Sequence, residues 1–209
     1  MSMDMQNSST NTVFVVDDDD AFRDSLTWLL DSSRYKIKSF SSGEKFLSGY
    51  QGESGCLLLD IRMPGINGLA LQQELNERNY RIPIIIITGH GDIPMAVTAI
   101  KNGALDFIEK PFDDQVLLDH VNRALKISAE WQLETAAKST VIGYWQTLSK
   151  REKQVMELVV NGMANKLIAE TLDISPKTVE VHRSRVMSKM NAQNLPELVH
   201  QAQIIKGME

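Results

Sequence analysis

The stretch CLLLDIRMPGING, from Cys56 to Gly68, says more about the fold than any other part of the sequence. It opens with four apolar residues and then places a carboxylate, Asp60, directly after them. A short and nearly continuous apolar run is typical of a parallel strand that is buried on both faces. We therefore expect Asp60 at the carboxyl end of such a strand, where open α/β sheets bind their ligands.

Similar short runs flank this stretch and alternate with amphipathic segments. The expected strands cover residues 13–16, 35–39, 56–59, 83–87 and 105–109. The expected helices cover residues 22–30, 43–50, 69–78 and 94–102, and a further helix begins at 113. Five strand–helix units within about 115 residues predict a doubly wound, five-stranded parallel sheet of the flavodoxin-like kind.

The rest of the chain is predicted to be all-helical. Its expected helices cover residues 149–160, 166–172, 175–190 and 195–204. The chain then divides into a polar, disordered terminus at 1–11, an α/β domain at 12–126 and a four-helix domain at 142–209. Residues 127–141 between the domains are polar and Ala-rich, which fits either an extension of the preceding helix or a semi-rigid linker.

Charge separates the two domains. The whole chain carries a net charge of −5, which taken alone argues against a nucleic-acid partner. Residues 1–125 hold 18 acidic and 11 basic residues, a net −7, whereas residues 126–209 hold 9 and 11, a net +2. Residues 175–191 alone hold four bases and one acid, a net +3. This asymmetry predicts that the two domains have different partners.

The sequence also indicates the cellular compartment in which the protein is expected. Its single cysteine, Cys56, lies in an apolar run and cannot form an intramolecular disulfide. Apolar runs are only a few residues long, far too short for a membrane span. With no signal peptide in the sequence, we expect a cytoplasmic protein without a membrane partner.

Acidic residues end two strands that should be neighbours. Asp17 and Asp18 follow the first strand, and Asp60 follows the third. Right-handed crossovers place these two strands side by side, so the three carboxylates should converge. Gathering them is electrostatically costly unless a cation is bound. Oxygen donors without His or Cys indicate Mg²⁺ or a similar hard ion.

The ends of the next two strands add a hydroxyl and an ammonium to the expected carboxylates and metal ion. Thr88 ends the fourth strand with a hydroxyl, and Lys110 follows the fifth with an ammonium. A carboxylate nucleophile, a metal, a hydroxyl and a lysine are the groups that accept a phosphoryl group, with Asp60 attacking in line. Each residue alone has an ordinary structural interpretation, such as a solvated turn, a helix cap or a surface lysine. The set is specific because its members stand at successive strand ends.

These motifs resemble the receiver domain of two-component response regulators. The matching stretches are VVDD at 15–18, LDIRMPGING at 59–68, TGH at 88–90 and KPF at 110–112. The resemblance implies that Asp60 is the phospho-acceptor, Lys110 the phosphate partner and Thr88 the switch hydroxyl. It also implies that Mg²⁺ is held by Asp18, Asp60 and the Arg62 backbone carbonyl, with Asp17 helping through water. Phe107 stands at the switch-aromatic position, where many receivers have Tyr, and Arg62 and His90 stand where residues tune dephosphorylation.

The helical domain contains a helix-turn-helix pattern. Residues 166–172, a turn and residues 175–190 have its spacing, with Ser175 as N-cap and Pro176 at the first helical position. At a helical period, Val179, Val186 and Met190 face inward, and polar, basic and small side chains face outward, as a major-groove reader needs. The residues expected to contact DNA are Lys177, Thr178, Glu180, Val181, His182, Ser184 and Arg185.

This domain resembles the LuxR/FixJ-type DNA-binding domain, so the chain as a whole, from about residue 12 to 207, resembles a FixJ-family regulator. The matching motifs include LSKRE at 148–152 and SPKTVEVHR at 175–183. The mechanism expected from the two sites is that a sensor histidine kinase phosphorylates the receiver, that residues 94–109 rearrange and pair in a dimer, and that the dimer binds promoter DNA, with RNA polymerase as a further partner. It leaves open whether the unphosphorylated receiver also covers the helix-turn-helix.

Two other functions fit parts of the sequence. A haloacid-dehalogenase-type phosphatase also uses an aspartate nucleophile, but it needs an acid two residues later, where this chain has Arg62. The C-terminal domain could instead bind a protein through a solvated charged face. We expect a regulator rather than an enzyme, with chemistry limited to phosphotransfer and self-dephosphorylation.

Overall fold

The computed structural model describes residues 12–33, 35–89 and 93–207. Residues in this part of the chain form two compact units, which divide between Gln132 and Leu133. The expected disorder of residues 1–11 and the role of His90 lie outside the described residues. Among the described helices, none is long and apolar enough to cross a membrane.

The first unit is built on a five-stranded sheet in the described part of the chain. The strands are β1 (Thr12–Val16), β2 (Lys36–Phe40), β3 (Cys56–Leu59), β4 (Ile84–Thr88) and β5 (Asp106–Glu109). All pairs are parallel, in the order β2-β1-β3-β4-β5. The expected doubly wound sheet is confirmed, and so is the neighbouring position of the first and third strands.

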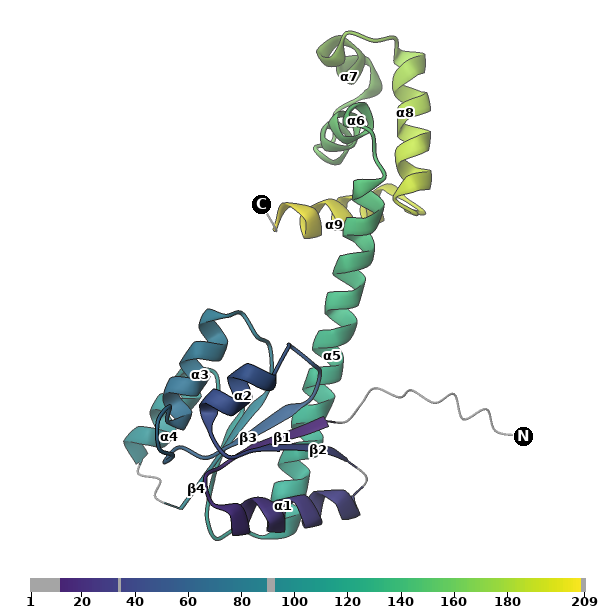
Figure 1. Ribbon diagram of the computed structural model, residues 1–209. Coiled ribbons are helices and arrows are strands. Elements are labelled where there is room, and N and C mark those ends of the chain that lie inside the picture. Colours follow the sequence, from purple (N-terminus) through teal and green to yellow (C-terminus); the bar gives the residue numbers. More distant parts are fainter. Residues whose placement is uncertain (1–11, 34, 90–92, 208–209) are drawn as a thin grey trace, which may run out of the picture. The chain divides into compact units, whose positions relative to one another are not determined.

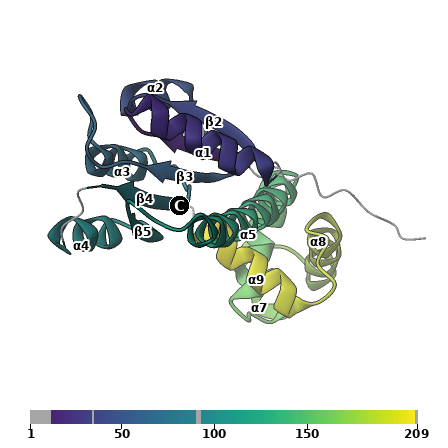
Figure 2. The same ribbon diagram turned by 90° about the horizontal axis from the view of Figure 1, so that it is seen from below.

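Helices cover both faces of this sheet (Figure 1; Figure 2). They are α1 (Asp20–Ser32), α2 (Gly43–Gly49), α3 (Gly68–Glu77), α4 (Ile93–Lys101) and α5 (Asp114–Gln146). Alternate residues of β1 explain the two layers, because Phe14 packs in a core with α2, α3 and α4, and Val15 packs in a core with α1 and α5. Strands β1, β3 and β4 are fully buried, as their continuous apolar runs predict.

Helix α5 is continuous through the stretch between the two predicted domains. Its 33 residues include the whole of the 127–141 segment. On the side of the first unit, the Ser128 hydroxyl accepts a hydrogen bond from the backbone N–H of Gly55 at 3.0 Å. Residues 132–140 of the helix are exposed. The domain limits at 126, 127 and 142 stay a prediction.

The second unit is helical. It contains α6 (Lys150–Val160), α7 (Asn165–Leu172), α8 (Pro176–Lys189) and α9 (Leu195–Lys206). Its core joins these helices to Val141, Tyr144 and Trp145 near the end of α5. Ser175 caps α8 by accepting the backbone N–H of Thr178, with Pro176 at the first helical position. The helix-turn-helix pattern is thus present as α7, a turn and α8.

Candidate functional site

Two buried carboxylates meet at the carboxyl end of the central strands. Asp17 follows β1 and Asp60 follows β3, and both side chains are buried. The backbone N–H of Asp60 donates to the Val16 carbonyl at 2.9 Å, which extends the β1–β3 ladder to the acidic residues. The sheet register therefore places the two carboxylates at one edge, as the sequence predicts.

Lys110 joins the two carboxylates. Its Nζ lies 2.7 Å from Asp17 Oδ2 and 3.2 Å from Asp60 Oδ1. Its backbone N–H donates to the Thr88 carbonyl at 2.9 Å, so pairing with β4 fixes where the side chain begins. The three groups carry a net charge of about −1 when all are ionised, which leaves the site attractive to a further cation.

The carboxylate of Asp60 is held at both oxygens. Oδ1 faces Lys110, and Oδ2 accepts the backbone N–H of Arg62 at 2.6 Å. Burial raises the pKa of Asp60, an effect that Lys110 opposes and the nearby charge of Asp17 reinforces. These contacts fix the orientation of a carboxylate that retains lone pairs for an incoming group.

The other predicted metal ligands are less closely gathered. Asp18 is exposed, and so is Arg62. In Arg62 it is the backbone carbonyl that the resemblance implies as a metal ligand. Among the described residues, no cluster of three or more His, Cys, Asp or Glu side chains is arranged to hold a metal ion. The donor set of Asp17 and Asp60 is nevertheless all oxygen and in excess of the one lysine charge. That chemistry fits a hard divalent cation.

The predicted switch residues occupy the neighbouring strands. Thr88 is the last residue of β4 and is buried. Phe107 lies on β5 opposite Ile86, partly buried against the core beneath α4. The strand order therefore places Thr88 on β4, between the strand that leads to Asp60 and the strand that carries Phe107.

One aromatic residue at this site, Phe22, is not marked by any motif in the sequence. The Lys110 ammonium lies 3.6 Å from the centroid of the Phe22 ring, in the first turn of α1. The Phe112 ring packs edge-to-face against Phe22. The only signal in the sequence is that both aromatics lie close to the acidic and lysine motifs, at 17–20 and 110–112.

In the second unit, the predicted inward-facing residues of α8 and its C-cap are buried as expected. Val179, Val186 and Met190 are buried. The exposed residues of the expected DNA-contacting set are Lys177, Glu180, Val181, Ser184 and Arg185. These side chains therefore form a surface that is accessible to a ligand.

Two members of that set are less exposed. The Thr178 hydroxyl lies 2.8 Å from that of Ser175, within the helix cap. His182 is partly buried, and its Nδ1 has no hydrogen-bond partner within the described residues. Cap formation and burial limit how far these two side chains can reach outward.

Internal contacts occupy two of the four basic residues of this segment. Arg183 donates to Asn165 Oδ1 at 2.8 Å, and Lys189 lies 2.7 Å from the buried carboxylate of Glu152. These bonds tie α8 to α7 and α6. Lys177 and Arg185 are both exposed to solvent.

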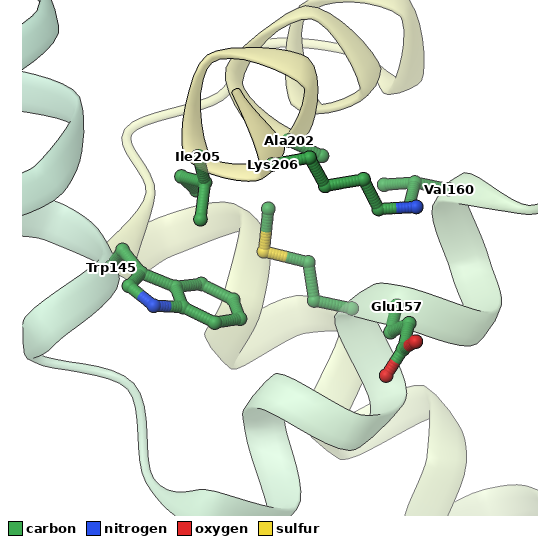
Figure 3. Close-up of a pocket in the computed structure, with 7 residues that line it drawn as sticks. Trp145, Glu157, Val160, Ala202, Ile205 and Lys206 are labelled. Atoms are coloured by element: carbon green, nitrogen blue, oxygen red, sulfur yellow. The ribbon is translucent and has the colours of Figure 1, made fainter. Parts of the chain in front are cut away.

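A small pocket lies elsewhere in this unit (Figure 3). Its lining is mainly apolar and comes from Trp145 on α5, Met156 and Val160 on α6, and Ala202 and Ile205 on α9, with Glu157 and Lys206 beside them. The residues that line it are separate from the exposed face of α8.

Comparison with known proteins agrees with both halves of the chain. Residues 13–122 match the family model of the response regulator receiver domain, and residues 146–202 match that of bacterial regulatory proteins of the luxR family. A receiver joined to such a DNA-binding domain defines a two-component response regulator, which controls transcription in a phosphorylation-dependent way.

Relatives that match most of the chain show which family of response regulators it belongs to. The transcriptional regulatory protein FixJ of Azorhizobium caulinodans is 51% identical over 191 residues, covering 91% of this chain and 90% of the relative. Among solved structures, the response regulator StyR has a TM-score of 0.81 at 42% identity, covering 92% of this chain and 98% of that one. Full-length FixJ from B. japonicum has a TM-score of 0.56 at 42% identity, covering 95% and 98%. The chain belongs to the FixJ family of response regulators.

Proposed function

We propose that Asp60 accepts a phosphoryl group from a sensor histidine kinase and that this modification controls promoter binding by the C-terminal unit. One observation carries the proposal: the buried Asp60 carboxylate lies 3.2 Å from the Lys110 ammonium, beside Asp17, at the carboxyl edge of the sheet. Family membership supports the same reaction class.

Each residue has a defined task in the transfer. One Asp60 oxygen forms a bond to phosphorus while the bond from phosphorus to the donor nitrogen breaks, and the negative charge stays on the phosphoryl oxygens. The Lys110 ammonium stabilises that charge, and the Arg62 N–H keeps the carboxylate oriented. Asp17 holds Lys110 at the site through its 2.7 Å contact.

The site is suited to Mg²⁺. Asp18, Asp60 and the Arg62 carbonyl would hold the ion, with Asp17 acting through water. When bound, the ion would neutralise carboxylate and phosphoryl charge and so lower the repulsion between the acidic residues and an incoming phosphate.

Thr88 and Phe107 would transmit the phosphorylation of Asp60 to the rest of the receiver. We assign to the Thr88 hydroxyl a contact with the phosphorylated Asp60. The Phe107 ring would supply the steric part of the switch, since Phe lacks the hydroxyl of Tyr.

Helix α4 carries a stripe of exposed apolar residues on successive turns, Ile93, Val97 and Ile100, of which Ile93 is 81% exposed. Such an apolar stripe is suited to pairing with a second copy of the chain once the 94–109 region is rearranged.

The paired chains would present two copies of α8 to adjacent half-sites of promoter DNA, where RNA polymerase is the further partner. Lys177 and Arg185 would contact phosphates, and Glu180, Val181 and Ser184 would face base edges. The protein would work in the cytoplasm. Its chemistry would be limited to phosphotransfer and self-dephosphorylation, so it would not turn over a separate substrate.

The test of the phospho-acceptor is labelling by acetyl phosphate. Asp60→Asn should remove the label, and Asp24→Asn, which changes an exposed carboxylate on α1, should label like the wild type. Excess EDTA should also prevent labelling, with Asp18→Ala costing more than Asp17→Ala. Full labelling of Asp60→Asn at another residue would overturn the assignment.

A further inference from the structure

The Lys110 ammonium has a third neighbour besides the two carboxylates. It stands over the face of the Phe22 ring, 3.6 Å from its centroid, and the lysine side chain is only 20% exposed. An ammonium at this distance is attracted by the negative face of the ring, and more strongly where water is excluded. We propose that Phe22 is a positioning residue for phosphoryl transfer, which acts by holding the Lys110 ammonium; this inference rests on the function proposed for Asp60.

The position of Phe22 is fixed by contacts on several sides. The backbone N–H of Phe22 donates to the Asp19 carboxylate at 3.1 Å, in the N-cap of α1. The next residue, Arg23, donates to the Asp17 carbonyl at 2.7 Å and so ties the same turn to the acidic loop. Phe112 packs against the ring at 6.2 Å between centroids and an interplanar angle of 83°. The ring is thus placed by the segments that carry Asp17 and Lys110.

An aromatic ring restricts the orientation of the lysine ammonium less than a hydrogen-bond acceptor does. Asp17 and Asp60 each fix one direction of the ammonium, whereas attraction to the ring face is broad and satisfies no N–H. The ammonium can therefore exchange its contact with Asp60 for one with a phosphoryl oxygen while it stays over the ring. Phe22 also covers one side of the ammonium, which keeps its charge effective at the reacting oxygens.

Phe22 also packs against the core beneath α1 and α5. A purely structural role would depend on its apolar volume, whereas the proposed role depends on its ring. The informative pair is therefore Phe22→Leu, which keeps an apolar side chain, and Phe22→Tyr, which keeps the ring. Trp28→Leu is the matched control, because Trp28 is an aromatic of the same helix that is 78% exposed.

The first measurement is the rate of labelling by acetyl phosphate at saturating Mg²⁺, in the full chain. Phe22→Leu should slow labelling by about five-fold, the size expected of a partly desolvated contact of this kind. Phe22→Tyr should stay within about two-fold of the wild type, and Trp28→Leu should not change the rate. Equal rates for Phe22→Leu and the wild type would overturn the proposal, and so would a loss that Phe22→Tyr fails to restore.

A second measurement reports the contact without any phosphoryl transfer. The ε-methylene protons of Lys110 should be shifted upfield by the ring in the proton–carbon NMR spectrum of the wild type and of Phe22→Tyr. They should return to ordinary lysine shifts in Phe22→Leu, and unchanged shifts there would contradict the contact. Asp60→Asn separates the two claims: if it still labels fully, the proposed function fails, whereas if it does not label and Phe22→Leu labels normally, only the role of Phe22 fails.

Discussion

The carboxylate of Glu152, in the first turn of α6, lies 2.7 Å from the ammonium of Lys189, the last residue of α8. Glu152 is buried and also accepts the backbone N–H of Ser149 at 2.8 Å in a capping box. The hydrogen bond from Lys189, followed by that from Ser149, lowers the pKa of Glu152 from 4.5 to about 2. One carboxylate thus caps α6 and fixes the C-terminal end of the proposed DNA-reading helix.

Neutralising this carboxylate should destabilise the second unit. Glu152→Gln should lower the free energy of unfolding by about 1–2 kcal/mol at pH 7, a modest value because Lys189 is partly exposed to solvent. Hydrogen exchange at the α6 amides of the full chain measures this loss. Lys189→Met should cause a similar loss, whereas Lys177→Met, which removes an exposed cation of the same helix, should cause almost none.

The same pair predicts a pH dependence. Because the folded-state pKa of Glu152 is depressed, its contribution is fully present above about pH 4.5 and is lost as the pH falls toward 2. The stability difference between the wild type and Glu152→Gln should therefore shrink over that interval. A difference that stays constant from pH 5 to pH 2.5 would contradict the pairing.

Thr88→Ala should separate phosphorylation from its output. The variant should still be labelled by acetyl phosphate, because the hydroxyl senses the phosphoryl group and does not accept it. Its phosphorylated form should dimerise at least about ten-fold more weakly than the wild type, a difference of about 1.4 kcal/mol. Sedimentation of the phosphorylated proteins measures this, and a dimer as tight as the wild type's would require another route for the signal.

The exposed stripe of α4 should be needed for dimerisation but not for labelling. Ile100→Glu places a charge on a surface that we expect to become buried between two chains, which should weaken the phosphorylated dimer by at least about ten-fold. Leu133→Glu, which changes an exposed leucine outside α4, serves as the control. Equal weakening by both variants, or by neither, would exclude this face from the interface.

Substitutions on α8 should divide into two kinds. Lys177→Ala should weaken binding to all DNA sequences alike and reduce the salt dependence by about one unit, as expected of a phosphate contact. Val181→Ala and Ser184→Ala should change sequence preference by about 1–3 kcal/mol per altered contact. Binding to a randomised DNA library at two salt concentrations distinguishes these effects, and identical specificity for Val181→Ala and the wild type would contradict the orientation of α8.

The fold was predictable because its central strands, β1, β3 and β4, are buried on both faces. The apolar run at 56–59 coincides with β3, and the other observed strands begin and end within one residue of the expected ranges. Strands β2 and β5 lie at the sheet edges and are less buried, as their mixed sequences indicate. The sequence left open the form of residues 127–141, since a polar, Ala-rich segment suits both a helix and a linker.

The site was predictable as far as it depends on sheet topology. Strand ends that meet at one edge bring Asp17, Asp60 and Lys110 together, and motifs mark all three. The contacts of Phe22 with Lys110 and of Glu152 with Lys189 depend instead on side-chain packing between elements that are far apart in the chain. No local pattern encodes such pairs, so only the structure reveals them.

The central claim is that a phosphoryl group on Asp60 controls DNA binding. The most direct measurement is the affinity of the full chain for promoter DNA with and without acetyl phosphate and Mg²⁺, for the wild type and for Asp60→Asn. We expect at least about ten-fold tighter binding by the phosphorylated wild type, a gain of about 1.4 kcal/mol, and no response from Asp60→Asn. An equal gain in both proteins, or no gain in a fully phosphorylated wild type, would contradict the claim.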